Sequence, residues 1–201
     1  MTESVHLRHL SLDLPPDVLT PLARTLSSEE AVRAARFHLA ADRRRFIAGR
    51  GLLRGLLGTT LNRPPGHLVF DYGPHGKPIL TGDDSHLRFN FSRSGDIALV
   101  ALAFGRDVGV DIERIRPDLD AASLAAHILP AAEADAVLAL PPDAQPDAFF
   151  RAWVRREAYL KALGVGFSAP TPLPFDADLW THFDVDVGPY HRAALVVGKA
   201  P

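Results

Sequence analysis

The sequence predicts a fold of the α+β class. The patterns along the chain run strand, helices and strands, then helices and strands again, which is not the regular strand–helix alternation of parallel-sheet proteins. The two halves are also similar in length and content. Because the chain has 201 residues, of which 47% are hydrophobic and 23% charged, we expect one globular domain or two small lobes that share a core.

The first half predicts a strand, two helices and a further group of strands. In order, its expected elements are a strand at 5–14, helices at 27–40 and 42–58, a Pro/Gly-rich stretch with short strands at 62–84, and two apolar strands within 87–104. The first helix has Ser27 or Ser28 at its N-cap, and Asp42 is the expected N-cap of the second. Three glycines inside the second helix each cost about 1 kcal/mol relative to alanine, so we expect neighbouring segments to pack closely there. They are Gly49, Gly51 and Gly55.

The second half begins with a strand and contains the strongest helical pattern. A turn at 105–107 leads into an apolar strand at 108–113, which would extend the two preceding strands into an antiparallel meander. The remaining expected elements are helices at 119–129, 131–140 and 147–164 and a terminal hairpin within 179–198. The last helix is expected to have Asp147 at its N-cap and to end at Gly164.

Composition excludes several kinds of site. The chain has no cysteine, which rules out disulfides, thiolate catalysis and cysteine-based zinc sites. No apolar run approaches the ~20 residues of a membrane span, and the first residues lack the pattern of a signal peptide, so we expect a cytoplasmic protein with no membrane partner. Of the 22 basic residues 19 are arginine, and seven of these lie between residues 33 and 54. Because aromatic residues are not interleaved with them and the net charge is −2, we expect no nucleic-acid partner.

Two carboxylates lie one residue apart at the end of the strand VGVDIE. Since side chains alternate along a strand, its two valines and its isoleucine are expected to face one way, and Gly109, Asp111 and Glu113 the other. Neighbouring carboxylates repel each other unless water or a cation separates their charges. The same spacing recurs at Asp184 and Asp186, so spacing alone does not distinguish a metal site from a solvated strand face.

The helix at 147–164 adds a third carboxylate. Glu157 and Lys161 lie one turn apart and could form a simple ion pair worth about 0.3–0.5 kcal/mol. Combined with the acid pair of the strand, however, Glu157 completes three oxygen ligands that suit Mg²⁺, which also binds water and substrate phosphate. The rest of a phosphorylated substrate would need basic residues, which Lys77 and the arginines between 33 and 54 could supply.

Four short motifs follow one another along the chain. They are GKP at 76–78, FNFSRSG at 89–95, VGVDIE at 108–113 and WVRREAYLKALG at 153–164. Each is weak alone, but in this order and at these separations they resemble the signatures of the Sfp-type 4′-phosphopantetheinyl transferases. The resemblance extends from residue 36 to residue 167.

The resemblance implies a fold and an activity. It implies two similar α+β lobes related by a pseudo-twofold axis, an N-terminal lobe at 1–106 and a C-terminal lobe at 107–201, with the active site in the cleft between them. Coenzyme A would bind there, and its 4′-phosphopantetheine arm would be moved to a serine of an acyl or peptidyl carrier protein, with release of adenosine 3′,5′-bisphosphate. Mg²⁺ would be the cofactor, and two lobes within one chain favour a monomer.

The resemblance also assigns roles to residues. Asp111, Glu113 and Glu157 match the family's magnesium site. Glu157 is in addition the candidate to accept the serine proton, and Lys161 to stabilise charge on the departing phosphate. The positions that match contacts to coenzyme A are Arg33, Arg45, Gly76, Lys77, Pro78, Ser92, Arg93 and Lys161.

Two positions depart from the family pattern. Arg93 stands where the family usually has histidine, and Arg156 where it usually has lysine. Arginine binds phosphate bidentately at every pH, so contact with phosphate should survive, whereas a role that needs a neutral imidazole would not.

Two other functions remain open on the sequence. A non-catalytic module could bind coenzyme A or another nucleotide without transferring the arm. A Mg²⁺-dependent phosphohydrolase would release phosphate without an acceptor protein. The presence of Asp111, Glu113, Glu157 and Lys161 together argues against a degenerate binder.

Overall fold

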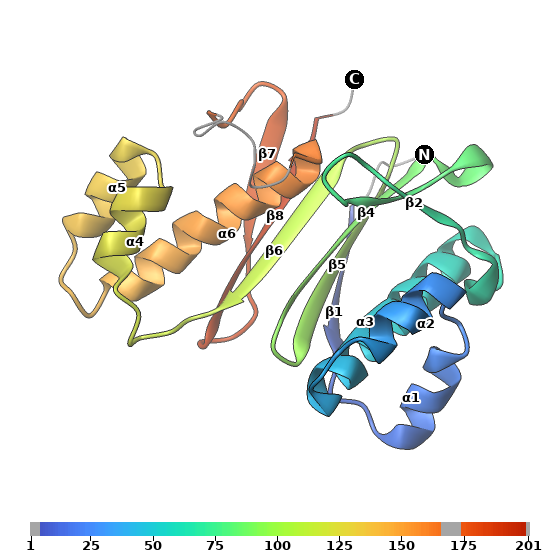
Figure 1. The fold of residues 1–201 in the computed structure, drawn as a ribbon. Coiled ribbons are helices and arrows are strands. Elements are labelled where there is room, and N and C mark those ends of the chain that lie inside the picture. Colours follow the sequence, from blue (N-terminus) through green and yellow to red (C-terminus); the bar gives the residue numbers. More distant parts are fainter. Residues whose placement is uncertain (1–4, 166–173, 200–201) are drawn as a thin grey trace.

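The structure, a computed structural model, describes residues 5–165 and 174–199. It contains two lobes in succession along the chain, each with a three-stranded antiparallel sheet and one long helix on the outer side of that sheet (Figure 1). The two sheets face each other, so the layers run helix, sheet, sheet, helix. The predicted α+β class and its two lobes are therefore confirmed.

The elements of the first lobe build one sheet and one separate hairpin. They are β1 (His6–Ser11), α1 (Pro16–Ala23), α2 (Ser28–Ala35), α3 (Ala40–Leu61), β2 (Phe70–Tyr72), β3 (Pro78–Leu80), β4 (Leu87–Ser94) and β5 (Ile97–Phe104), with 3₁₀ turns at Pro65–His67 and Gly82–Asp84. In the sheet, β5 lies between β1 and β4, and β2 pairs with β3 as a hairpin.

The elements of the second lobe build the other sheet and its helical cover. They are β6 (Val108–Arg114), α4 (Ala121–Ile128), α5 (Ala131–Leu138), α6 (Gln145–Leu163), β7 (Trp180–Val185) and β8 (His191–Gly198). In this sheet β8 lies between β6 and β7. Strands β7 and β8 form the predicted terminal hairpin. The predicted lobe boundary at 106/107 falls between β5 and β6. Residues 1–4, 166–173 and 200–201 of the predicted lobes lie outside the described residues.

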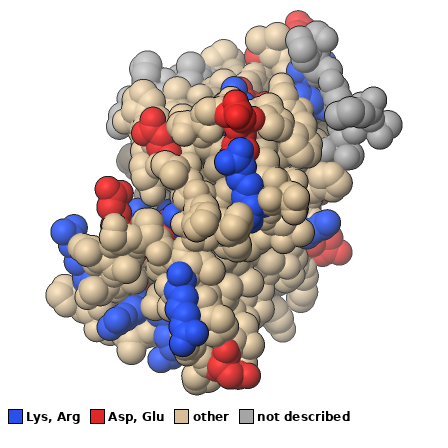
Figure 2. Space-filling view, turned by 90° about the vertical axis from the view of Figure 1, so that its right-hand side faces the viewer, with Lys and Arg blue, Asp and Glu red and all other residues tan. Residues whose placement is uncertain are grey.

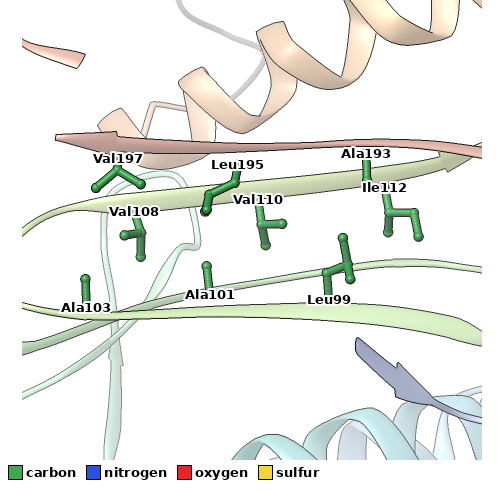
Figure 3. Packing of buried hydrophobic residues seen from close by; sticks show 9 residues of the cluster. All are labelled: Leu99, Ala101, Ala103, Val108, Val110, Ile112, Ala193, Leu195 and Val197. Carbon is green, nitrogen blue, oxygen red and sulfur yellow. The ribbon is translucent and has the colours of Figure 1, made fainter. Parts of the chain in front are cut away.

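An apolar core joins the two sheets (Figure 3). It consists of Leu99, Ala101, Ala103, Val108, Val110, Ile112, Ala193, Leu195 and Val197. The predicted alternation along β6 is thereby confirmed, because its branched residues enter this core while Gly109 faces α6. A Cβ atom on Gly109 would lie 2.9 Å from Ala162 Cα and closer still to the Ala158 carbonyl oxygen, so β6 and α6 are in direct backbone contact.

The helices of the first lobe follow the predicted signals in part. Ser27 caps α2 through a capping box, in which Ser27 Oγ accepts from Glu30 N at 3.2 Å and Glu30 Oε2 accepts from Ser27 N at 2.9 Å. Close packing is confirmed at Gly49 and Gly51, where an added Cβ would lie 2.9 Å from a Phe91 ring atom and 2.6 Å from Leu22 Cβ, respectively. The prediction of close packing is wrong for the third glycine of α3, Gly55, because nothing lies within 4 Å of a Cβ added there.

Three further local predictions are wrong. α3 begins at Ala40, and the carboxylate of Asp42 accepts a hydrogen bond from Arg45 inside the first turn instead of capping the helix. α6 begins at Gln145, so Asp147 also lies inside its first turn. The meander ends after β5, because β6 pairs with β8 of the other sheet. The predicted end of α6 is confirmed by a left-handed Gly164 at its C-cap.

Helix α1 was not predicted from the sequence. Prolines at positions 15, 16 and 21 favour a loop there. Pro16, however, occupies the first helical position, where a missing backbone N–H costs nothing, and the helix is held by packing on α3. Among the described residues, no helix combines the length and the apolar character that crossing a membrane requires.

Candidate active site

A cavity of about 260 Å³ lies where the two lobes meet. The β2–β3 hairpin contributes Gly76, Lys77 and Pro78 to its wall, and α6 contributes Glu157 and Lys161. The structure therefore brings the GKP motif of the first lobe to the same cavity as the helical motif of the second, about 80 residues further along the chain. Residues of one small cavity can contact one ligand together.

Ser92, Asp111 and Lys161 form a hydrogen-bonded cluster beside this cavity. Lys161 Nζ donates to Asp111 Oδ1 at 2.5 Å and to Ser92 Oγ at 2.9 Å. Ser92 Oγ in turn donates to Asp111 Oδ1 at 2.7 Å. Asp111 and Ser92 are 3% and 6% exposed, while the Lys161 side chain keeps 31% of its surface. Three elements, β4, β6 and α6, thus place three of the predicted site residues in contact.

Glu113 and Glu157 lie near this cluster. In the part of the chain that the structure describes, neither carboxylate forms an ion pair like the one between Asp111 and Lys161. Glu113 Oε2 accepts a hydrogen bond from Ser94 Oγ at 3.1 Å. Burial, followed by the charge of Asp111, raises the pKa of the Glu113 carboxyl above its usual range. The same two causes, in the same order, raise the pKa of Glu157 to about 7. Glu157 is therefore suited to accept a proton near neutral pH.

The donor set fits a divalent cation. Asp111 Oδ2 and Glu157 Oε1 are buried and have no hydrogen-bond partner among the described residues. Buried carboxylate oxygens are normally paired or bound to metal, and the ammonium of Lys161 is hydrogen-bonded to Asp111 Oδ1, which leaves Asp111 Oδ2 and Glu157 Oε1 without a partner among the described residues. Nevertheless, within the described part of the chain no three His, Asp or Glu side chains are arranged closely enough to hold a metal as they stand. The role of Asp111, Glu113 and Glu157 as metal ligands stays a prediction.

Lys77 lies at the cavity but its ammonium is directed into the lobe junction. Lys77 Nζ donates to Val108 O at 3.2 Å and to Ala162 O at 3.1 Å. The second acceptor is in the last turn of α6, where helix carbonyls attract cations. Burial lowers the pKa of Lys77 to about 8. This side chain ties the β2–β3 hairpin to both β6 and α6, and its predicted contact with nucleotide phosphates is untested.

Arg93 is separated from Ser92 by the alternation of β4. Ser92 is buried and points toward β6, whereas Arg93 is exposed and follows Phe89 and Phe91 on the face toward α3. The structure therefore does not bring the predicted Ser92–Arg93 pair together at one point. Contact of Arg93 with phosphate stays a prediction that requires the ligand to reach around the edge of β4.

Arg33 and Arg45 also lie apart from the carboxylate cluster. Arg45 Nε bonds Asp96 Oδ1 at 2.6 Å and its Nη1 bonds Asp42 Oδ1 at 3.2 Å, so two carboxylates already share its charge. The Arg33 guanidinium lies over the Phe46 ring at 5.4 Å. Figure 2, which looks onto the side of the molecule that carries the first lobe's helices, shows basic side chains set apart among wide areas of uncharged residues. The roles of both arginines toward a 3′-phosphate stay predictions.

One arginine of the basic stretch at 33–54 stabilises the fold, a role that the sequence did not reveal. Arg54 is 1% exposed, and its Nε donates to Glu30 Oε2 at 2.6 Å. Its Nη1 donates to the backbone oxygens of Pro65 and Leu68, both at 3.0 Å. Arg54 therefore joins α2, α3 and the turn after α3, and it is not available to a ligand.

Two polar residues of β4 belong to the site although no role was predicted for them. Asn90 Oδ1 accepts from Val110 N at 2.9 Å, and Ser94 Oγ accepts from Arg114 N at 3.0 Å while donating to Glu113. Asn90 and Ser94 flank Ser92 at spacings of two, so the alternation of FNFSRSG was the signal that could have found them.

Two protein-family models match successive parts of the chain. One, described as "4′-phosphopantetheinyl transferase, N-terminal", matches residues 16–104. The other, described as "4′-phosphopantetheinyl transferase superfamily", matches residues 107–195. The two matches meet between β5 and β6, where the first sheet ends and the second begins.

Curated proteins of the same description are similar to the chain. The 4′-phosphopantetheinyl transferase HetI of Nostoc sp. is 45% identical over 171 residues, which cover 84% of this chain and 72% of HetI. The 4′-phosphopantetheinyl transferase psf-1 of Bacillus pumilus is 34% identical over 143 residues, covering 71% and 60%. The L-aminoadipate-semialdehyde dehydrogenase-phosphopantetheinyl transferase of Xenopus laevis is 33% identical over 156 residues, covering 72% and 51%. The matched regions thus span between about half and about three quarters of these relatives.

Proposed function

This chain belongs to the 4′-phosphopantetheinyl transferase superfamily, and from that premise we propose that it moves the 4′-phosphopantetheine arm of coenzyme A to a serine of an acyl or peptidyl carrier protein. The proposal includes a requirement for Mg²⁺, the Sfp-type subgroup indicated by the four motifs, and a monomeric state. The observation that carries it is the contact between Ser92, Asp111 and Lys161 beside a cavity that Glu157 also lines.

Three carboxylates are the proposed ligands of the cation. Asp111 and Glu157 each offer a buried oxygen without a partner among the described residues, and Glu113 lies next to them on β6. A divalent ion held there would neutralise part of the charge on the diphosphate of coenzyme A and favour departure of the leaving group. 

The chain's own side chains supply positioning and proton transfer. Lys161 is partly exposed and can donate to a phosphate oxygen while still contacting Asp111. Ser92 Oγ lies within hydrogen-bond distance of both and can help to orient the same phosphate. Glu157 is the proposed acceptor of the carrier serine's proton. Its pKa of about 7 is that of the protein without the cation.

The proposed reaction is a single group transfer. The carrier's serine oxygen bonds to the phosphorus of the phosphopantetheine arm. The bond from this phosphorus to the bridging oxygen of the diphosphate breaks, and adenosine 3′,5′-bisphosphate leaves with the electron pair. The serine proton passes to Glu157, and no oxidant or reductant is needed.

Incubation of the protein with coenzyme A, Mg²⁺ and an apo carrier protein is expected to add about 340 Da to the carrier, and EDTA in place of Mg²⁺ is expected to prevent the addition. Intact-protein mass spectrometry measures the addition, and adenosine 3′,5′-bisphosphate should appear in equal amount. A panel of apo carriers from fatty-acid, polyketide, peptide and lysine pathways identifies the acceptor.

The same experiment separates the two other candidate functions. Tight binding of coenzyme A with no mass shift on any carrier would support a non-catalytic binding module. Release of phosphate in the absence of any carrier would support a Mg²⁺-dependent phosphohydrolase. Either result would contradict the proposed transfer.

A further inference from the structure

Strands β4 and β6 lie next to each other at the lobe junction without forming a β-ladder (Figure 1). Within the described residues, β4 pairs with β5 and β6 pairs with β8, and the two strands belong to different sheets. One edge of β6 therefore faces β4 without a strand partner. Backbone N–H groups at such an edge need other acceptors when they are buried.

Side chains of β4, and not its backbone groups, form the hydrogen bonds between β4 and β6. We call Asn90, Ser92 and Ser94 the inter-lobe seam, since they occupy every second position of β4 and each bonds to β6. The bonds are Asn90 Oδ1 to Val110 N at 2.9 Å, Ser92 Oγ to Asp111 Oδ1 at 2.7 Å, Ser94 Oγ to Glu113 Oε2 at 3.1 Å and Ser94 Oγ to Arg114 N at 3.0 Å. Partners are 19 or 20 residues apart in every case, so the two strands run parallel at a constant offset.

The seam bonds to one edge of β6 in particular. Alternate residues of a strand direct their backbone groups to opposite edges. The backbone N–H groups of Val110 and Arg114 point to the seam, and the carbonyl oxygen of Val108 accepts from Lys77 Nζ at the same edge. These even-numbered residues are the ones whose β6 backbone groups are turned away from β8. Side chains of the first lobe thus satisfy three backbone groups of an edge that has no strand partner.

The seam adds to the ladder with β8 in fixing which side chains of β6 face Lys161. A shift of β6 by one residue would exchange its two faces, placing Asp111 in the apolar core and Ile112 at the site. The hydrogen bond from Val110 N to Asn90 and that from Arg114 N to Ser94 are available in only one register. The offset between the strands is therefore fixed by side chains and not by a ladder.

We infer that Ser94 and Asn90 are positioning residues for this transfer, because, together with the ladder to β8, they hold β6 so that Asp111 contacts Lys161, which lines the cavity. Ser94 acts most directly, since one hydroxyl contacts both the Glu113 carboxylate and the next backbone amide. Asn90 acts nearer the start of β6, where its buried side-chain oxygen accepts a hydrogen bond from the backbone N–H of Val110. The inference rests on the proposed function, which it extends to residues outside the ligand set.

A pair of substitutions at Ser94 tests the inference. Ser94→Ala removes the hydroxyl and is expected to weaken Mn²⁺ binding in the presence of coenzyme A about tenfold, and to raise the Mg²⁺ concentration needed for half-maximal transfer by a similar factor. Ser94→Thr keeps the hydroxyl in a residue that suits strands and should restore both values to near those of the natural protein. Ser85→Ala, at an exposed serine of the same lobe, is the matched control and should change neither. Calorimetric titration measures Mn²⁺ binding without any acceptor protein.

Asn90→Ala is the second variant and has its own readout. Val110 N lies in a strand edge without a ladder, yet its amide should exchange with solvent slowly in the natural protein because Asn90 accepts from it. In Asn90→Ala this amide should exchange at least about tenfold faster, together with weaker Mn²⁺ binding. Hydrogen exchange monitored at Val110 measures the effect.

The outcomes decide the inference separately from the proposed function. Unchanged Mn²⁺ binding in both Ser94→Ala and Asn90→Ala, or loss of binding in Ser94→Thr equal to that in Ser94→Ala, would overturn it. A fall in thermal stability alone, with the metal dependence unaltered, would show a merely structural role and would also overturn it. If the natural protein labels no carrier, the proposed function fails, while the Mn²⁺ titrations still show whether these residues position the carboxylates.

Discussion

Replacement of Glu157 by glutamine is expected to abolish transfer and, at the same time, to stabilise the protein in the absence of metal. The side chain is 7% exposed, and its Oε1 has no partner among the described residues. Burial, and after it the charge of Asp111, raises its pKa to about 7. Glutamine has the same shape without the charge, so the free energy of unfolding should rise by about 1–2 kcal/mol near pH 8.

The stabilisation by Glu157→Gln should depend on pH in a defined direction. Because the folded-state pKa of Glu157 is raised from 4.5 to about 7, the folded state binds more protons than the unfolded state between these values. The contribution of Glu157 to stability is complete below pH 4.5 and is lost as the pH rises through about 7. The stabilities of the two proteins in EDTA should therefore agree below about pH 4.5, separate between pH 4.5 and about 7, and stay apart by a constant amount above that. A difference that stays constant across the range would contradict this explanation.

The activity of Glu157→Gln should fall by roughly 10³-fold or more, since both a proton acceptor and a metal ligand are removed. Carrier labelling measured by mass spectrometry gives the rate. Asp143→Asn, at an exposed aspartate in the turn before α6, is the matched control and should alter neither labelling nor stability. Labelling by Glu157→Gln at the natural rate would remove Glu157 from the proposed mechanism.

The second large effect is expected for Gly109→Ala, which should destabilise the protein by at least about 3 kcal/mol. A Cβ at Gly109 would lie 2.9 Å from Ala162 Cα and nearer still to Ala158 O and Ala162 N. These are backbone atoms of α6, so no side-chain rotation relieves the overlap, and β6 must move away from the helix. That movement would also separate Asp111, two residues further along, from Lys161.

Denaturant unfolding measures the effect of Gly109→Ala, and Gly55→Ala provides the matched control. Nothing lies within 4 Å of a Cβ at Gly55, which is inside α3. Alanine should there stabilise the protein by up to about 1 kcal/mol through its higher helix propensity. If both alanine variants unfolded at the same denaturant concentration, the close contact between β6 and α6 would not have the importance assigned to it.

Much of the secondary structure was predictable because its signals are local. The capping box of Ser27 and Glu30 needs only three residues of separation, and Gly164 ends α6 through its own left-handed backbone. Asp42 and Asp147 were mistaken for caps because an acidic residue in the first turn and one at the N-cap look alike in sequence.

The position of β6 was harder to predict because it depends on contacts distant in sequence. A turn at 105–107 is equally compatible with a third strand of the same sheet and with a strand that starts another. The choice is made by β8, which pairs with β6 from about 80 residues further along the chain. Val108, Val110 and Ile112 indicated a buried face but not which sheet would cover it.

The candidate site was predictable as a set of residues and not as a set of contacts. The order of motifs indicated that Ser92, Asp111 and Lys161 belong to one site, and the structure places them in contact. Spacing could not show that Lys77 would bond to two backbone carbonyls across the lobe junction. Alternation likewise put Asn90 on the same face as Ser92 without showing that β6 would cover that face.

Anomalous diffraction from crystals of the protein grown with coenzyme A and Mn²⁺ tests the central claim most directly. The claim is that Asp111 and Glu113 of β6 and Glu157 of α6 hold one divalent ion against the diphosphate. It predicts a single strong anomalous peak at roughly 2–2.5 Å from oxygens of all three carboxylates and of the diphosphate. A peak bound elsewhere, or bound coenzyme A with no peak among these carboxylates, would contradict it.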